Sequence, residues 1–317
     1  MVRIAVLDDY QNVALQMADW TVLGKDAEIV VFNDHVADPA QSIERLRDFD
    51  VVCLMRERTP MPRSTLEALP KLKLLVTTAM RNASVDLAAA AERGITVCGT
   101  GGVGHPTAEL TWGLILALMR SIPFESQAMR DGGWQTTLGR SLKGKTLGLI
   151  GLGTLGGQVA RIGVAFGMEV LAWSQNLTAR RAAEVGARLA PLDELLIQAD
   201  VVSIHVVLSG RTRGLLGAPE LARMKPTAYL VNTSRGPIVD ETALIDALEN
   251  RRIAGAGIDV YGTEPLPATH RLRRLPNALL TPHLGYVTDD TYAVFYRDTV
   301  EDIRAWLDGK PIRVIQA

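Results

Sequence analysis

The sequence contains very little cysteine and few aromatic residues. Only two of its 317 residues are cysteines, Cys53 and Cys98, and aromatic residues make up 5%. Each cysteine lies within an apolar run, which favours a buried free thiol in a reducing compartment over a disulfide. Hydrophobic residues nevertheless make up 47% of the chain, enough for each of about two domains to bury a sizeable core.

Net charge and long hydrophobic runs are also nearly absent. The chain has 34 lysines and arginines against 35 acidic residues, and a net charge of −1 gives no indication of a nucleic-acid or membrane partner. The longest apolar run, Leu110–Met119, falls well short of the ~18 residues of a membrane helix. The first residues, MVRIAVLDDY, are typical of a strand rather than of a signal peptide. We therefore expect a soluble, cytoplasmic protein that binds neither nucleic acid nor membrane and holds no metal.

Short β-branched segments alternate with helical segments over residues 1–100. Strands are expected at residues 3–7, 28–32, 51–55, 72–78 and 95–99, with helices at 41–49 and 85–94. This alternation predicts a parallel sheet with helices on both faces. The following segment, Pro106–Met119, is apolar nearly all round, which predicts a helix buried in a core or in a subunit interface.

A second alternation begins at Lys145. Strands are expected at residues 146–150, 168–173, 201–207, 228–234, 253–260 and 279–283, with helices at 151–167, 192–199 and 241–251. The end of the chain predicts one amphipathic helix over residues 289–309, followed by a short strand at 312–315. The second half is therefore also predicted to be an α/β domain.

A glycine-rich loop joins the first strand and helix of this second half. Gly151, Gly153 and Gly156 have the spacing G-x-G-x-x-G directly after a strand and at the start of a helix. In a dinucleotide-binding loop the first glycine allows a tight turn, the second a close approach to the pyrophosphate, and the third close helix–strand packing. The pyrophosphate would lie at the helix N-terminus, where unpaired N–H groups favour an anion.

Three later motifs accompany this loop. They are NTSRGPIVDETAL at residues 232–244, GIDVYGTEPLP at 257–267 and TPHLG at 281–285. In this order, the four motifs resemble the D-isomer-specific 2-hydroxyacid dehydrogenase family, which includes D-3-phosphoglycerate dehydrogenase, glyoxylate/hydroxypyruvate reductases and D-lactate dehydrogenase. The resemblance extends over the whole chain.

The resemblance implies an α/β fold with two doubly wound parallel-sheet domains. A Rossmann domain that binds NAD(P), residues 101–284, would be inserted into a flavodoxin-like substrate domain, residues 1–100 and 285–317, with the active site in the cleft between them. The family commonly pairs through the region of the Pro106–Met119 helix, so we expect a homodimer.

The resemblance also implies a catalytic set of Arg235, Glu264 and His283. Arg235 would hold the substrate carboxylate and polarise the 2-oxo group, because a planar guanidinium can bind such groups bidentately. His283 would exchange a proton with the 2-oxygen as general acid and base, and Glu264 would orient its imidazole. The nicotinamide would carry the hydride to or from the 2-position of a small D-2-hydroxy acid or 2-oxo acid.

Further residues are expected to contact the cofactor. They lie in the glycine loop and at the ends of the neighbouring strands: Gly151, Gly153, Thr154, Leu155, Gly156, Ser174, Gln175, Asn176, Arg180, His205, Val206, Val207, Thr212, Thr233, Ser234, Asp259 and Gly285. The segment from His205 would act through its backbone, with Val207 in place of a proline that is frequent in the family. Asp259 would lie near the nicotinamide carboxamide; a capping or turn role is the alternative.

Substrate contacts are expected from Arg56, Met80, Arg81, Asn82 and Tyr286. Arg56 matches a substrate-contacting arginine of the phosphoglycerate enzymes, although a surface salt bridge would explain it equally well. Met80, Arg81 and Asn82 stand where many relatives have small residues of a glycine-rich loop, and Tyr286 also replaces a small residue. These departures predict a bulkier pocket that carries an extra cation.

The cofactor is expected to be NAD(H) or NADP(H), and the residues after the strand at 168–173 favour NADP(H). An acidic residue normally follows this strand, bonds the adenosine ribose and repels a 2′-phosphate. Here Ser174, Gln175 and Asn176 follow it, and Arg180 and Arg181 come shortly after. The alternative is that Ser174 bonds the ribose and both arginines face solvent.

The motifs do not separate the activities within the family. A phosphoglycerate dehydrogenase, a glyoxylate or hydroxypyruvate reductase, and even a formate or phosphite dehydrogenase would share them. A second class of function is a nucleotide-sensing, corepressor-like scaffold of the same fold. Turnover of 2-oxo acids with NAD(P)H distinguishes an enzyme from a sensor that only binds the nucleotide.

Overall fold

The chain folds into two compact units of parallel α/β structure. The computed structural model describes residues 1–316. One unit contains Met1–Val103 together with the C-terminal segment from Thr288, and the other contains Gly104–Val287. The unit boundaries lie slightly later in the chain than residues 100/101 and 284/285.

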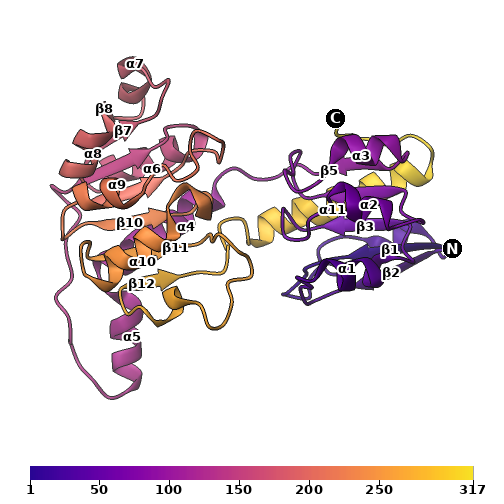
Figure 1. Ribbon diagram of the computed structural model, residues 1–317, viewed down its shortest axis with the longest axis horizontal. Helices are drawn as coiled ribbons and strands as arrows, with labels where there is room; N and C mark the ends of the chain where they lie inside the picture. Colours follow the sequence, from indigo (N-terminus) through magenta and orange to yellow (C-terminus); the bar gives the residue numbers. More distant parts are fainter. Residues whose placement is uncertain (317) are drawn as a thin grey trace. The chain divides into compact units, whose positions relative to one another are not determined.

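The first unit is built on a five-stranded parallel sheet (Figure 1). Its strands are β1 Val2–Val6, β2 Ala27–Val31, β3 Val51–Leu54, β4 Leu74–Thr77 and β5 Thr96–Gly99. Its helices are α1 Pro39–Leu46, α2 Arg63–Glu67, α3 Leu87–Glu92 and α11 Asp289–Leu307, with a 3-10 turn at Trp20–Leu23. The strand order β2-β1-β3-β4-β5 is the flavodoxin-like order that the resemblance implied.

Helices cover both faces of this sheet because strand residues alternate between its faces. Ala5, Val52 and Leu75 share one apolar core with residues of α1, α2 and α3. The alternate residues, such as Cys53, point to the opposite face, and α11 packs there against β4 and β5. Both cysteines are buried free thiols, as the sequence predicted.

The second unit contains a seven-stranded parallel sheet (Figure 1). Its strands are β6 Thr146–Ile150, β7 Glu169–Trp173, β8 Arg188–Leu189, β9 Val201–Ile204, β10 Tyr229–Asn232, β11 Gly255–Ile258 and β12 Ala278–Leu280. The order β12-β11-β10-β9-β6-β7-β8 becomes 7-6-5-4-1-2-3 when β6 is counted as the first strand. This is the Rossmann order with one further strand at the edge.

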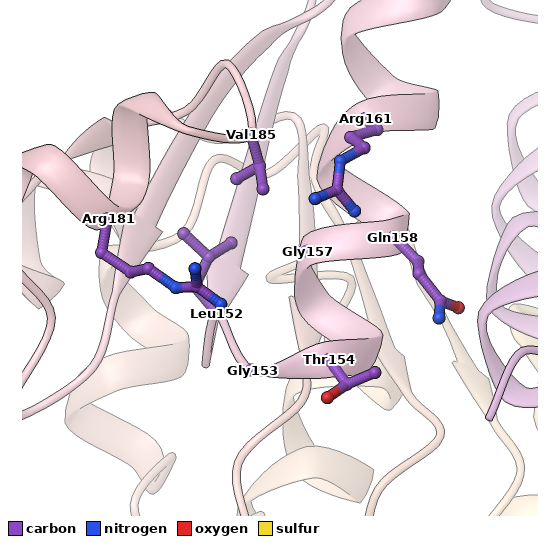
Figure 2. A pocket seen from close by; sticks show the side chains of 8 residues that line it. All are labelled: Leu152, Gly153, Thr154, Gly157, Gln158, Arg161, Arg181 and Val185. Carbon is purple, nitrogen blue, oxygen red and sulfur yellow. The ribbon is translucent and has the colours of Figure 1, made fainter.

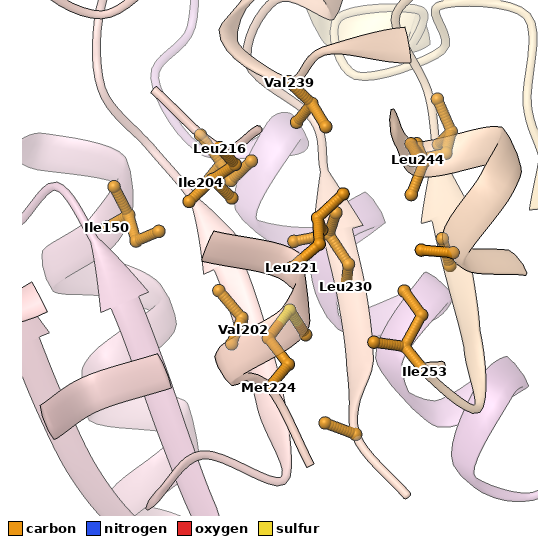
Figure 3. Packing of buried hydrophobic residues seen from close by; sticks show 14 of the residues in the cluster. Ile150, Val202, Ile204, Leu216, Leu221, Met224, Leu230, Val239, Leu244 and Ile253 are labelled. Carbon is orange, nitrogen blue, oxygen red and sulfur yellow. The ribbon is translucent and has the colours of Figure 1, made fainter. Parts of the chain in front are cut away.

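Two apolar cores lie on the two faces of this larger sheet. On one face, α8 Leu192–Gln198, α9 Ala218–Arg223 and α10 Glu241–Glu249 pack on strand residues such as Val202 and Leu230 (Figure 3). On the other face, α4 Pro106–Met119 and α6 Thr154–Ala165 cover strand residues such as Leu149 and Val231. The predicted fold class, two doubly wound parallel-sheet domains, is therefore confirmed.

The helix at α4 forms with the predicted bounds and is not buried on all sides within one chain, so a core alone does not account for its apolar surface. Pro106, Trp112 and Ile115 are buried, whereas Glu109 and Gly113 are exposed and Leu116 and Leu118 are only partly buried.

The structure also contains short elements that the sequence did not predict. They are α2, α5 Ile122–Arg130, α7 Ala179–Ala183, α9 and β8.

The strand predicted at residues 312–315 does not form. Val314 instead makes an isolated antiparallel bridge to Cys98, and Ile315 N donates to Val97 O at 2.8 Å. Arg313 has a φ of +50°, which interrupts the extended backbone that a strand requires. Its guanidinium Nε donates to Asp302 on α11 at 2.9 Å, so the tail is held by side-chain contacts as well.

Burial raises the pKa of Asp302 to about 7, although Arg313 opposes the shift. The side chain is fully buried, and no residue in the described part of the chain hydrogen-bonds to its Oδ2. An acid whose pKa is higher in the folded state stabilises the fold below its unfolded pKa of about 4 and loses that contribution as the pH rises through about 7. The first unit should therefore become less stable over this range.

We predict that Asp302→Asn flattens this pH dependence. The wild-type contribution that is lost between pH 4 and pH 8 should be on the order of 2 kcal/mol, after allowance for screening. Thermal unfolding midpoints across this range measure it. Asp308→Asn, an exposed acid near the end of the same helix, serves as the matched control and should keep the wild-type slope. An unchanged slope in Asp302→Asn would contradict the assignment.

Candidate active site

Three neighbouring strands of the second unit end at the predicted catalytic residues. Arg235 follows β10, Glu264 lies in the loop after β11, and His283 follows β12. The strands are adjacent and parallel in the order β12-β11-β10. Their carboxyl ends therefore meet at one edge of the sheet, where open α/β sheets bind their ligands.

Glu264 and His283 form a short hydrogen-bonded pair. His283 Nδ1 lies 2.5 Å from Glu264 Oε2, and the other carboxylate oxygen accepts the Tyr261 N–H at 2.9 Å. The side chains retain 16% and 25% exposure for His283 and Glu264, so water or a small ligand can reach them. The carboxylate fixes the ring orientation and leaves Nε2 as the nitrogen for proton exchange with a ligand.

The loop that carries His283 is held by a buried carboxylate. Asp259 is 1% exposed and accepts hydrogen bonds from Thr281 Oγ1 at 2.6 Å, Leu284 N at 2.7 Å and Gly285 N at 2.9 Å. Burial raises the pKa of this carboxyl. The loop backbone is also constrained at His283 itself, whose φ is +54°. Asp259 therefore positions the loop that carries His283.

The backbone around Arg235 is held against the loop after β11. A Cβ on Gly236 would lie 2.2 Å from the carbonyl carbon of Tyr261, so only glycine allows this approach. Asn232 closes the turn, because its Nδ2 donates to Arg235 O and its Oδ1 accepts from Ser234 N, both at 3.0 Å. The Tyr261 hydroxyl lies 2.9 Å from Thr281 O, which links this loop to the His283 loop. No role was predicted for Asn232, Gly236 or Tyr261, although the first two lie in the NTSRGPIVDETAL motif and Tyr261 lies in GIDVYGTEPLP.

The glycine loop has the geometry that dinucleotide binding requires. Gly151 has a φ of +102°, and a Cβ there would lie 2.6 Å from the His205 backbone. A Cβ on Gly156 would lie 2.2 Å from Gly151 O, whereas Gly153 has no atom within 4 Å of its Cβ position. The N-terminus of α6 is thus open to an anion beside Gly153. These residues fit a dinucleotide cofactor.

A pocket of about 190 Å³ adjoins this loop (Figure 2). Its lining comprises residues of the loop, α6 and the α7 region: Leu152, Gly153, Thr154, Gly157, Gln158, Arg161, Arg181 and Val185. Leu155, Ser174, Gln175, Asn176 and Arg180 from the sequence prediction do not line it.

The segment after β9 contacts the segment after β10. Ser234 Oγ donates to Val206 O at 2.5 Å, and Val207 is 83% exposed. Thr212 Oγ1 donates to Val207 O at 2.6 Å. His205 Nε2 lies 2.9 Å from Ser203 Oγ, and burial lowers the pKa of His205 to about 4, so this imidazole is neutral near pH 7. The role of this segment as a backbone contact to the cofactor stays a prediction.

Two predicted contact residues have structural partners within the second unit. Thr233 is buried, and its Oγ1 lies 2.8 Å from Thr111 Oγ1 on α4. Gly285 O accepts a hydrogen bond from Thr107 Oγ1 at 2.7 Å.

Tyr286, a predicted substrate contact, packs edge-on against His283, with ring centroids 5.4 Å apart. Of the predicted substrate contacts, only Tyr286 therefore lies beside the predicted catalytic set within this unit.

The other predicted substrate contacts lie after β3 and β4 of the first unit. Asn82 is buried, and its Nδ2 donates to Arg56 O and to Thr77 Oγ1, both at 2.8 Å. It therefore joins the two loops rather than presenting its amide to solvent. Met80 is 45% exposed and Arg81 is exposed, so these two side chains are accessible at the carboxyl edge of the sheet.

The described part of the chain contains neither a candidate metal cluster nor a candidate membrane span. Residues 1–316 contain no group of three or more His, Cys, Asp or Glu side chains placed to hold a metal ion. Among the helices in this range, none has the length and apolar character needed to cross a membrane.

Comparison with known proteins gives consistent matches. A family model described as D-isomer specific 2-hydroxyacid dehydrogenase, NAD binding domain, matches residues 112–285. The glyoxylate reductase of Aeropyrum pernix is 36% identical over 301 residues, which cover 91% of this chain and 89% of that protein. The D-3-phosphoglycerate dehydrogenase of Synechocystis is 35% identical over 277 residues, 86% of this chain but only 50% of that protein. The crystal structure of a phosphoglycerate oxidoreductase from Vibrio cholerae has a TM-score of 0.92 and 37% identity, and the match covers 98% of this chain and 100% of that one.

Two glycine variants distinguish packing from ligand approach. Gly156→Ala places a methyl group against Gly151 O, so we predict a fall of several degrees in the unfolding midpoint together with loss of dinucleotide binding. Gly153→Ala meets no protein atom, so its midpoint should stay within about 2 °C while dinucleotide affinity falls at least about tenfold. Calorimetry and nucleotide titration measure both. Wild-type affinity in Gly153→Ala would contradict a pyrophosphate site at this loop.

Proposed function

This chain belongs to the D-isomer-specific 2-hydroxyacid dehydrogenase family, and we propose that it is an NAD(P)-dependent oxidoreductase of a small D-2-hydroxy acid. The observation that carries the proposal is the 2.5 Å hydrogen bond between Glu264 and His283. These two residues follow β11 and β12, which lie beside β10, the strand that Arg235 follows. The same unit contains the open glycine loop. A proton-exchanging group, a carboxylate-binding cation and a nucleotide loop are the parts that this reaction needs.

Each residue has a distinct proposed role. Arg235 binds the substrate carboxylate and polarises the 2-oxo group. His283 Nε2 donates a proton to the 2-oxygen during reduction and accepts it during oxidation, while Glu264 holds the ring. A nicotinamide, when bound, supplies or accepts the hydride. Asp259 keeps His283 in place through its three hydrogen bonds to the loop.

The substrate is proposed to be a phosphoglycerate-, glyoxylate- or hydroxypyruvate-type acid. Relatives of this chain are named D-3-phosphoglycerate dehydrogenase, glyoxylate reductase and glycerate dehydrogenase. Arg56, Met80, Arg81 and Tyr286 are the proposed substrate contacts. Asn82 is better explained as a positioning residue, because its Nδ2 donates to Arg56 O in the loop after β3 and to Thr77 Oγ1 at the end of β4.

The cofactor is proposed to be NADP(H) at least as readily as NAD(H). Ser174, Gln175 and Asn176 follow β7 where an acidic residue would repel a 2′-phosphate. Without that repulsion, one well-placed arginine contact of about 1.5–3 kcal/mol would be enough to favour the phosphorylated cofactor tenfold.

We predict turnover when the protein is assayed with a panel of 2-oxo acids and both reduced cofactors. At least one of glyoxylate, hydroxypyruvate and 3-phosphohydroxypyruvate should be reduced, and kcat/KM with NADPH should equal or exceed that with NADH. Nucleotide binding without turnover of any acid would favour a nucleotide sensor and refute the enzyme proposal. A preference for NADH above about tenfold would refute the cofactor proposal alone.

We also propose a cytoplasmic homodimer that pairs through α4 and the segment that follows it. Leu116 and Leu118 on α4 are only partly buried. Beyond α4, large apolar side chains remain exposed: Ile122 at 52%, Phe124 at 59%, Met129 at 53%, Trp134 at 74% and Leu138 at 96%. Apolar side chains clustered in this way along one segment are typical of a protein–protein interface.

Light scattering at micromolar concentration should therefore give about twice the chain mass of 34.4 kDa. A Phe124→Glu, Trp134→Glu double variant should shift the protein to monomer, because two charges would have to be buried in the interface. Leu15→Glu, an equally apolar position at 54% exposure in the first unit, is the control and should leave the mass unchanged. A wild-type monomer would contradict the proposal.

A further inference from the structure

The pocket beside the glycine loop is lined by two arginines from different helices. Arg161 lies on α6 and Arg181 on α7, and Figure 2 shows their guanidinium groups extending toward the same space from opposite sides. Leu152 and Val185 give this pocket its apolar wall, and Gly157 leaves room because it has no side chain. The pocket volume of about 190 Å³ is large enough for a phosphate group with part of a ribose.

The charges around this pocket favour an anion. None of its lining residues is acidic. Arg181 Nη1 donates to Glu184 Oε2 at 2.6 Å, but Glu184 does not line the pocket. Within residues 1–316, Arg161 makes no ion pair with any carboxylate. Two cations at one pocket repel each other, and an anion placed between them removes that repulsion.

The pocket is continuous with the nucleotide loop. Gly153 and Thr154 belong both to the loop and to the pocket lining. Thr154, Gly157, Gln158 and Arg161 occupy positions i, i+3, i+4 and i+7 of α6, so one helix face leads from the loop to Arg161. A ligand whose pyrophosphate lies at the α6 N-terminus would therefore bring its adenosine end close to this pocket.

We propose that Arg161 and Arg181 bind the 2′-phosphate of NADP(H). This inference rests on the proposed function, since it assigns the cofactor selectivity of the same nucleotide site to two named residues. Guanidinium groups bind phosphate oxygens bidentately and remain charged, which suits a dianionic monoester. Arg180, which the sequence suggested for this role, lies on the same helix but outside the pocket. The sequence did not point to Arg161 because it lies on α6, before β7, whereas the residues that usually select the cofactor follow the end of β7.

Nucleotide fragments test the proposal without reference to turnover. Calorimetry should compare adenosine 2′,5′-bisphosphate with 5′-AMP, which differ only in the 2′-phosphate. Wild-type protein should bind the bisphosphate at least about tenfold more tightly. Arg161→Gln and Arg181→Gln should each weaken bisphosphate binding about tenfold or more while the 5′-AMP dissociation constant stays within about twofold. Arg180→Gln is the matched control on α7 and should change neither constant.

Other outcomes overturn the assignment in identifiable ways. Equal weakening of both nucleotides, or an equal effect of Arg180→Gln, would indicate general charge attraction instead of a specific site. Equal wild-type affinity for the two fragments would refute the 2′-phosphate site, yet reduction of a 2-oxo acid with NADH would leave the proposed function intact. If the protein bound neither fragment and reduced no acid, the proposed function itself would fail.

Discussion

The arrangement at the candidate active site depends on one buried carboxylate. Asp259 follows β11, is almost inaccessible to solvent, and accepts three hydrogen bonds from the loop after β12. Because this loop carries His283 in a left-handed backbone conformation, the Asp259 contacts stabilise a position that the backbone alone would disfavour. With His283 held in this position, the loop after β11 places the Glu264 carboxylate within hydrogen-bond distance of its imidazole.

The second constraint on this unit is that two glycines lie too close to neighbouring backbone for any side chain to fit. Gly236 brings the Arg235 segment against Tyr261, and Gly156 brings α6 against the turn at Gly151. At both positions a single methyl group would collide with backbone atoms that cannot rotate away. Packing thus joins the nucleotide loop and the proposed catalytic loops to one sheet edge, and the chemistry depends on that shared frame.

Much of this organisation could be predicted from the sequence, because β-branched strands and the glycine loop are local signals. Apart from the short edge strand β8, the strands of both sheets form where they were expected, and so do long helices such as α4 and α11. Short elements such as α7 were not predicted, because five residues contain too little periodicity. The tail at 312–315 does not form a strand because Arg313 has a positive φ. Asn82 and Arg161 depend on tertiary contacts between distant segments, which no local pattern encodes.

Substitution at the proposed acid–base pair tests the central claim most directly. His283→Ala should lower kcat by about 10²–10⁴-fold while leaving the dissociation constant of the dinucleotide nearly unchanged, because the glycine loop binds the nucleotide independently. Arg235→Ala should instead also raise KM, since it removes a carboxylate contact. Single-turnover kinetics and nucleotide titration on the two variants separate these effects. Turnover in His283→Ala within about threefold of wild type would contradict the account.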